Sequence, residues 1–536
     1  MSLSKVQLSE GQLEHHRIWK YVILALVGLF AAKFVQRLRF RSKYKLPGLE
    51  PGLPFVGNAL QIPRGMKERL QYLSDLRDKH GEMFTLDIGG TRWIFLNSHR
   101  VVTDLLDKRA AIYSSRRPTP MSHLATRGRR LLMMPYGDLW RRERNVMHQI
   151  LNQTQQQIFA PWQDLESKAL LYNYLANSDE WYKAHAAFSG SVILAVVFGR
   201  RATPDDQDFR ASLQATDEYL AMLGPGSSVA DIFPFLTQMP YFAKLQPWRW
   251  HADELYERTA AEVNTVDASH EREADEGSIY KKEVEGVKEL MRLGVQKPCF
   301  MTEFLESKAD RAFTEEEVLF IAGTLLEAGT DTTRMSLNQI VAAATLWPEW
   351  AATTRKHLDR SDYLSAEDVE QLPYIKAVVK ESFRWKPSIA EIGSPHSLTR
   401  DDEYEGYKFP AGSIFMSNAW LIANDPNEYD QPDRFWPERF LNEDIDKRLS
   451  GHVGFGAGRR VCVGYNVGTT NMHIAVARLL YCFDFVSTGQ IDMSKPLSID
   501  PEHPPCEVKV TVRSDAHRRL IERECRDAAF EAETGS

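Results

Sequence analysis

The chain has 536 residues, of which 43% are hydrophobic, so it is long enough to bury a large core. Its formal net charge of -7 argues against a nucleic-acid partner, because such proteins are normally basic. The cysteines number five and are scattered, which argues against a disulfide scaffold and favours a reducing compartment.

The N-terminal region contains one short apolar stretch. Residues 18–35 are apolar apart from Lys20 and Lys33, whose amines can reach a membrane surface from either end. A helix of this length just crosses a thin bilayer. The basic residues in 33–45 predict that this flank stays in the cytosol. A cleaved signal peptide is the alternative, but no small-residue cleavage site follows the apolar stretch.

Alternating prolines and glycines in residues 46–54 predict a stiff, non-helical connector between this stretch and the rest of the chain. We therefore divide the chain into an N-terminal tail (1–17), a transmembrane anchor (18–35), a basic flank with a Pro/Gly hinge (36–57), one large domain (58–514) and a polar tail (515–536).

Helical periodicity dominates the large domain. Strand signals are short, at residues 83–88, 92–96, 404–409 and 507–512. A highly charged stretch, residues 266–288, is typical of a solvated helix face or a loop. The expected fold class is therefore mainly α with small β-sheets.

Residues 314–347 predict one long helix. Thr314 and Glu317 form a capping-box pattern at its start, and Pro348 follows its end. At ~1.5 Å per residue, this helix is on the order of 45 to 50 Å long and would cross the whole domain.

The middle of this helix has an unusual composition. Ala328 and Gly329 are small, and Asp331 and Thr332 carry an acid and a hydroxyl. An acid and hydroxyls are poor choices for a helix interior in a core, so they favour a turn that a ligand approaches. A polar turn that faces solvent is the alternative.

The strongest local signal is a glycine-rich loop, residues 455–464, which presents Cys462 just before a helix predicted over 464–485. The helix N-terminus and nearby arginines favour the anionic form of the sulfur. A thiolate is the form in which cysteine binds iron. Phe455 can shield the sulfur, and Arg460 can pair with an anionic group of a cofactor. A buried structural cysteine is the alternative.

The spacing of Phe455, Gly458, Arg460, Cys462 and Gly464 resembles the signature of the cytochrome P-450 family. The other family motifs follow in the expected order and cover nearly the whole chain. The resemblance implies a triangular, α-rich prism in which haem b lies between the long helix and the cysteine-loop helix. Cys462 is then the metal ligand, and the large domain is a haem-thiolate catalytic domain.

The resemblance also assigns roles to the other motifs. Residues 328–333 resemble the family's oxygen-binding groove, with Ala328 and Gly329 next to the cofactor and Asp331 and Thr332 as catalytic residues. Trp140 and Arg144 match a Trp-x-x-x-Arg motif, and one helical turn separates them, so both reach a haem propionate.

Two further motifs take their roles from the resemblance. His396, with Arg460, is expected at the propionates, and a plain turn histidine is its alternative. Glu381 and Arg384 share one face of a helix predicted over 373–386. With Arg439 they match a buried ion-pair triad that holds the cysteine loop, although a Glu-x-x-Arg pattern alone indicates only a surface salt bridge worth roughly 0 to 1 kcal/mol.

These assignments imply a monooxygenase that inserts one oxygen atom from O2 into a small lipophilic substrate. No flavin or dinucleotide pattern follows the cysteine loop, so we expect electrons from a NADPH-cytochrome P-450 reductase, with a small haem protein as a further candidate donor. Four basic residues predict a docking surface for this electron donor, and ordinary solvated arginines are the alternative: Arg141, Arg142, Arg459 and Arg460. The expected location is the endoplasmic reticulum membrane, with a single span and the catalytic domain in the cytosol.

Residues 381–387 and 402–407 resemble fungal biosynthetic members of the family, which implies an aromatic or secondary-metabolite substrate. Two other classes stay open: a haem-thiolate isomerase, dehydratase or peroxide-rearranging enzyme without O2 turnover, and a non-catalytic haem sensor or carrier. Intact Asp331 and Thr332 argue against both.

Overall fold

A computed structural model describes residues 19–21, 24, 27, 28, 31, 32, 35, 36, 38–53, 56–117, 119–203, 206–223, 228–232, 236–237, 246–260, 278–359, 368–369, 371–387, 395–497, 500 and 503–529. Most of these residues are helical, and the strands are short. The predicted fold class, mainly α with small sheets, is therefore confirmed.

The elements are as follows. Helices of the first half are α2 (Met66–His80), α3 (His99–Val102), α4 (Ala110–Tyr113), α5 (Pro120–Thr126), α6 (Asp138–Ile150), α7 (Gln156–Ala176), α8 (Trp181–Phe198), α9 (Gln207–Leu223), α10 (Val229–Ile232) and α11 (Pro247–Thr259). Helices of the second half are α12 (Ile279–Leu293), α13 (Phe300–Glu306), α14 (Glu315–Leu346), α15 (Pro348–Leu358), α17 (Pro373–Trp385), α18 (Ala419–Ala423), α19 (Tyr465–Cys482) and α20 (Asp515–Glu524). Short 3-10 or π turns are η1 (Thr103–Lys108), η2 (Gln153–Gln155), η3 (Ser178–Glu180), η6 (Ala309–Ala312), η7 (Pro437–Phe440) and η8 (Gly458–Arg460).

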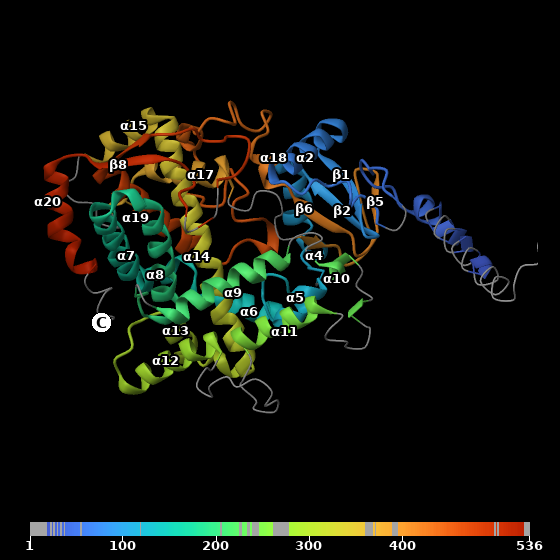
Figure 1. The fold of residues 1–536 in the computed structure, drawn as a ribbon, viewed down its shortest axis with the longest axis horizontal. Helices are drawn as coiled ribbons and strands as arrows, with labels where there is room; N and C mark the ends of the chain where they lie inside the picture. The colour runs from blue at the N-terminus through green and yellow to red at the C-terminus, as the bar shows by residue number, and fades with distance from the viewer. Residues whose placement is uncertain are drawn as a thin grey trace, which may run out of the picture.

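The strands form three small sheets. One has the order β1-β2-β6-β3, in which β1 (Met83–Ile88) pairs antiparallel with β2 (Thr91–Leu96), β2 parallel with β6 (Ile414–Ser417), and β6 antiparallel with β3 (His396–Ser397). The others are the pairs β4 (Asp402–Tyr404) with β5 (Tyr407–Phe409), and β7 (Phe483–Ser487) with β8 (Val508–Val512). Figure 1 shows β1, β2 and β6 at one end of the body, with α2 and α18 beside them.

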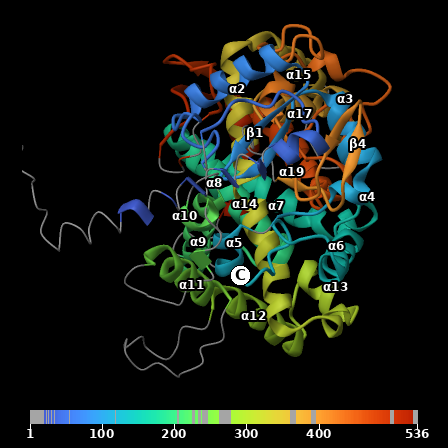
Figure 2. The ribbon, with the colours of Figure 1, turned by 90° about the vertical axis from the view of Figure 1, so that its right-hand side faces the viewer.

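The long helix α14 organises the helical part of the body. Thr314 accepts a hydrogen bond from the Glu317 N–H, and the Glu317 carboxylate accepts one from the Thr314 N–H, so the predicted capping box is confirmed. Helix α8 packs along α14, and α7 and α19 pack against this pair. Figure 2 shows α14 running through the body, so its middle is surrounded by protein.

Two sequence predictions are wrong in detail. Residues 404–409 form a hairpin instead of one strand, because Glu405 and Gly406 adopt positive φ angles of 50° and 76° that reverse the chain. The helix predicted over 464–485 ends at Cys482, because Phe483 and Phe485 pair with β8 instead. The partner strand was itself predicted, at residues 507–512, but it is distant in the sequence, so no local pattern indicated that the two segments pair.

The predicted anchor, residues 18–35, lies only in part within the described residues, and residues 1–17 lie outside them. The described residues between 19 and 43 are helical and extend away from the body (Figure 1). In the described part of the chain, one helical segment, Ser178–Phe198, is long and apolar enough to span a membrane. However, 78% of its apolar window is buried inside the protein, as expected of a core helix.

The C-terminal segment contains a packed helix. Ile521, Cys525 and Ala528 are buried, and their spacing places them on one helical face against α7. The Ala528 carbonyl accepts a hydrogen bond from Arg201 (2.6 Å), whose guanidinium also pairs with Glu166 of α7. Residues 515–529 thus pack on the body, although their composition predicted a polar tail.

Candidate active site

The cysteine loop has a tightly constrained backbone. The Cys462 N–H donates to the Phe455 carbonyl (2.8 Å), which closes residues 455–462, including η8, into a loop before α19. Gly456 and Gly458 have φ angles of 75° and 64°, in the left-handed region that favours glycine. A Cβ at Gly458 would lie 1.9 Å from the Leu106 carbonyl oxygen. Glycine at position 458 is therefore required by its close approach to η1.

Cys462 differs from the other four cysteines, which are all buried, because it is exposed. The surrounding protein still raises the pKa of its thiol by burial, while the Gly464 backbone N–H and the Arg144 guanidinium lower that pKa. Arg144 lies in α6 and donates to the Val461 carbonyl, so it is held beside the sulfur. A metal ion at the sulfur would offset the effect of burial on the pKa of the Cys462 thiol. With such a cation bound, this arrangement favours the thiolate.

Arg460 belongs to a group of inward-facing cations. Its guanidinium donates only to backbone carbonyls among the described residues, those of Ser114 (2.7 Å), Leu131 (3.3 Å) and Met134 (2.8 Å). Burial, followed by repulsion from Arg116 and Arg144, lowers the pKa of Arg460 to about 8. Burial also lowers the pKa of Arg116 to about 9. Because these cations repel one another, an anion between them would be stabilised.

Trp140 and His396 surround the same group of cations. The Trp140 ring centroid lies 4.1 Å from the Arg460 guanidinium carbon. His396 is buried in β3 and bonds through Nδ1 to the Tyr113 carbonyl (2.8 Å). Burial and the charge of Arg116 hold the pKa of His396 well below its usual value. The structure thus brings together Trp140, Arg144, His396 and Arg460, as the motifs predicted. It adds Arg116, which carried no specific sequence signal.

The middle of α14 presents one accessible face. Ala328 and Thr332 are exposed, whereas their neighbours Leu326, Thr330 and Thr333 are buried. The Thr332 hydroxyl donates to the Ala328 carbonyl (3.1 Å). This face is the part of the central helix that a ligand can reach.

Gly329 lies at a different place on the same turn. A Cβ there would lie 2.4 Å from Ile193 of α8. Gly329 therefore allows α8 to pack closely on α14, whereas its predicted position was on the accessible face with Ala328.

Asp331 is held by an arginine of its own helix. Arg334 donates to the Asp331 carboxylate (2.7 Å), and the Arg334 side chain is buried. On α9, burial and the charge of Asp331 raise the pKa of Asp217. Sequence reasoning missed Arg334 and Asp217. The spacing of Asp331 and Arg334 was visible in the sequence, but the neighbouring α9 carboxylate was not.

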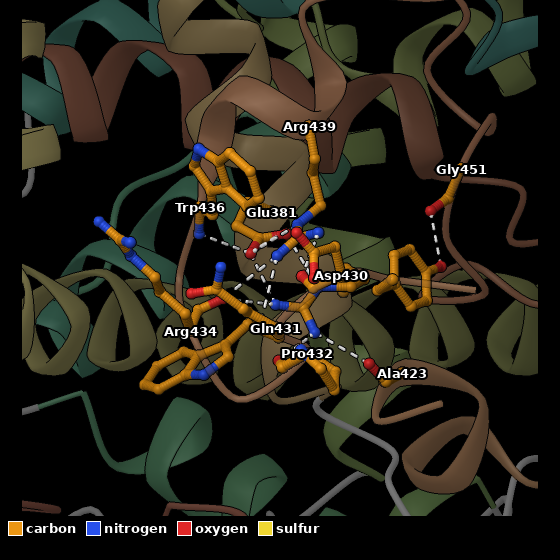
Figure 3. Close-up of polar contacts among 12 residues, drawn as sticks. Glu381, Ala423, Asp430, Gln431, Pro432, Arg434, Trp436, Arg439 and Gly451 are labelled. Carbon is orange, nitrogen blue, oxygen red and sulfur yellow. Dashed lines mark hydrogen bonds and ion pairs between the residues drawn. The ribbon is translucent and has the colours of Figure 1, made fainter. Parts of the chain in front are cut away.

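Glu381, Arg384 and Arg439 form one buried ion-pair group, and Figure 3 shows Glu381 with Arg439 and the surrounding residues. Arg384 donates to Glu381 twice (2.6 and 2.8 Å), and Arg439 once (3.2 Å). The Trp436 N–H donates to the same carboxylate (2.8 Å). Arg384 also donates to the carbonyls of Ala423, Pro432 and Arg434. The group thus fastens residues 423–439 to α17.

The predicted basic surface is smaller than expected. Arg141 and Arg459 are exposed, and both lie over the Tyr136 ring. Arg142 is exposed as well and donates to the Ala312 carbonyl. Arg460 does not belong to this surface, because its guanidinium is turned inward toward buried carbonyls.

These features define a class of protein. Three features of the site suit a haem. They are an accessible cysteine in a glycine loop, inward-facing arginines that would stabilise an anion, and an accessible turn of a central helix. The haem iron takes a thiolate, and its propionates need cations. The residues present therefore fit haem, and the fold and the site are those expected of a haem-thiolate protein.

Comparison with known proteins agrees with this assignment to the haem-thiolate class. The model of the cytochrome P-450 family matches residues 47–505. The cytochrome P-450 monooxygenase fogE of Aspergillus ruber is 31% identical over 86% of this chain and 84% of its own length. The monooxygenase aneD of Aspergillus aculeatus is 32% identical (90% and 91%), and verL of Clonostachys rogersoniana is 30% identical (91% and 90%). The chain belongs to the cytochrome P-450 family and is an oxidoreductase of its monooxygenase class, which implies a haem cofactor, a redox partner and a small-molecule substrate.

Proposed function

We propose that this enzyme inserts one oxygen atom from O2 into a small lipophilic substrate of fungal secondary metabolism, with electrons from a NADPH-cytochrome P-450 reductase. The observation that carries the proposal is the acid and hydroxyl of Asp331 and Thr332 on the accessible middle of α14. An enzyme that only rearranges its substrate does not need this pair to deliver protons.

The chain's own residues hold the cofactor. Cys462 would hold the haem iron through its thiolate, and the Arg144 guanidinium lowers the pKa of that thiol. Arg460 and His396 would bind the haem propionates, and the Trp140 ring packs against the Arg460 guanidinium. Once bound, haem supplies the oxygen and electron chemistry that amino-acid side chains lack.

Thr332 and Asp331 handle protons. Thr332 Oγ1 is a donor and an acceptor, and it can turn from the Ala328 carbonyl toward a ligand on the accessible face. Arg334 holds the Asp331 carboxylate through an ion pair, on the residue that neighbours Thr332 in the same helix. We assign Asp331 the transfer of protons from solvent to the site. We assign the Thr332 hydroxyl the role of receiving these protons through a hydrogen bond.

Substrate class and location are further parts of the proposal. The relatives named above are fungal monooxygenases, which supports a biosynthetic substrate.

Trp19, Tyr21, Leu24 and Val27 are between 59% and 71% exposed, which would be costly in water and is favourable in a bilayer. We assign residues 18–35 as a single-pass anchor in the endoplasmic reticulum membrane, with the catalytic domain in the cytosol.

The test measures substrate-dependent consumption of NADPH and O2 by the full-length enzyme with its reductase, using Cys462→Ala as the inactive control. Oxygen-independent turnover would support the isomerase alternative, and binding without turnover would support a haem sensor or carrier. Both results would refute the proposal.

The roles of the proton-handling pair need their own measurement, which is product formed per NADPH oxidised, with hydrogen peroxide assayed in parallel. Thr332→Ala should still consume NADPH but divert it to peroxide. Asp331→Asn should slow turnover and enlarge the solvent isotope effect. Thr330→Ala is a matched control, because Thr330 also donates to a carbonyl four residues earlier but is buried. Unchanged coupling in Thr332→Ala would exclude its hydroxyl as the proton-receiving group.

A further inference from the structure

A buried ion pair lies next to the accessible face of α14. Glu327 directly precedes Ala328 in this helix, and its carboxylate pairs with the Arg130 guanidinium. Both side chains are 7% exposed. Arg130 belongs to the loop between α5 and α6, so the pair joins two segments that are distant in the sequence. Breaking such a pair is costly, because each buried charge would lose its partner.

Two tyrosines complete this buried group. The Tyr280 hydroxyl donates to the other oxygen of the Glu327 carboxylate. The Tyr280 ring packs on α14 at Gly323, where a Cβ would lie 2.5 Å from that ring. The Arg130 guanidinium carbon lies 3.4 Å from the centroid of the Tyr219 ring. Helices α9, α12 and α14, which contact one another (Figure 2), therefore hold the Arg130 side chain in place.

The backbone of Arg130 belongs to the turn that holds Arg460. The Arg130 carbonyl accepts the Met134 N–H (3.1 Å), which closes a turn over residues 130–134. Two carbonyls of this turn, those of Leu131 (3.3 Å) and Met134 (2.8 Å), accept hydrogen bonds from the Arg460 guanidinium. Arg130 therefore contacts α14 with its side chain and closes the turn beside Arg460 with its carbonyl.

We propose that Glu327 is a positioning residue for the cofactor: its ion pair with Arg130 fixes the turn at residues 130–134, and this turn directs the Arg460 guanidinium toward the haem propionates. The inference rests on the proposed role of Arg460 at those propionates. Among the described residues, Arg460 donates only to backbone carbonyls, so the position of its guanidinium depends on where these carbonyls lie. A displaced turn would move the guanidinium away from the anion that it binds.

The test measures transfer of haem from the full-length ferric enzyme to excess apomyoglobin, followed by absorbance, without reductase or substrate. Arg460→Gln should speed this transfer by about tenfold or more, because the propionates lose a charged donor. Glu327→Gln should speed it by about threefold to tenfold, because the turn is no longer fixed. The double variant should transfer haem no faster than Arg460→Gln alone, since Glu327 acts through Arg460.

A matched control separates positioning from general stability. The Glu166–Arg201 pair is as buried as the Glu327–Arg130 pair, but Arg201 connects it to Ala528 in the C-terminal segment. Glu166→Gln should therefore lower the free energy of unfolding, as Glu327→Gln does, and leave the rate of haem transfer unchanged.

A second variant keeps the charge of the pair. Arg130→Lys preserves the cation and the backbone carbonyl but loses the planar fork of the guanidinium. It should also speed haem transfer, by a smaller factor than Glu327→Gln, and it provides the test if Glu327→Gln does not fold.

The outcomes distinguish this inference from the role of Arg460. Faster transfer in Arg460→Gln with unchanged transfer in Glu327→Gln and Arg130→Lys would overturn the inference alone. Additive effects in the double variant, or equal acceleration in Glu166→Gln, would do the same. Unchanged transfer in Arg460→Gln would overturn the propionate role of Arg460 and the inference with it.

Discussion

The buried ion pair between α17 and Arg439 allows a quantitative test. Glu381 is 0% exposed and accepts from two arginines and the Trp436 N–H. Removing one partner of a buried pair costs roughly 3 to 5 kcal/mol, because a charge is left unpaired. Arg384 keeps its three carbonyl acceptors in Glu381→Ala, so we expect a loss of about 3 kcal/mol in the free energy of unfolding.

The assay is guanidinium unfolding of the holoenzyme, followed by circular dichroism and by haem absorbance in parallel. The cycle of Glu381→Ala, Arg384→Ala and the double variant should give a coupling energy of about 2 to 3 kcal/mol. Glu180→Gln is the matched control. Its carboxylate pairs with Lys183 at 2.7 Å but is 45% exposed, so it should change stability by roughly 0 to 1 kcal/mol. A coupling energy below about 0.5 kcal/mol would refute the reasoning.

Three further predictions follow from local geometry and charge. Burial lowers the pKa of His185 to about 4, so between this value and ~6.5 the unfolded state binds one more proton. Stability should therefore fall with falling pH in that window, and His185→Gln should reduce the slope by about 1.4 kcal/mol per pH unit, measured by denaturant unfolding. Gly458→Ala should abolish haem incorporation, measured by absorbance, because its Cβ would overlap the Leu106 carbonyl. Gly464→Ala, which meets nothing within 4 Å, should not. Deletion of residues 1–36 should release the protein from membranes with haem binding intact. A truncated enzyme that remains bound after a carbonate wash would contradict the anchor.

The sequence alone determined the features that local chemistry sets. The boundaries of α14 follow from the capping box at Thr314 and Glu317 and from Pro348, all within a few residues of the helix ends. The cysteine loop was equally visible, because its glycines are required by left-handed backbone positions at fixed spacing from Cys462. Strands β1 and β2 were also predicted, since the residue types that favour strands are a property of each segment.

Only the tertiary structure decided which distant groups meet. Helix α19 ends at Cys482 because Phe483 pairs with Val512, a partner separated by many residues. Arg460 and Arg459 are neighbours in sequence, yet one guanidinium is turned toward buried carbonyls and the other is exposed over Tyr136. Gly329 allows α8 to pack closely on α14. Periodicity indicates which face of a helix is buried, but the packing of other elements determines what each side chain contacts.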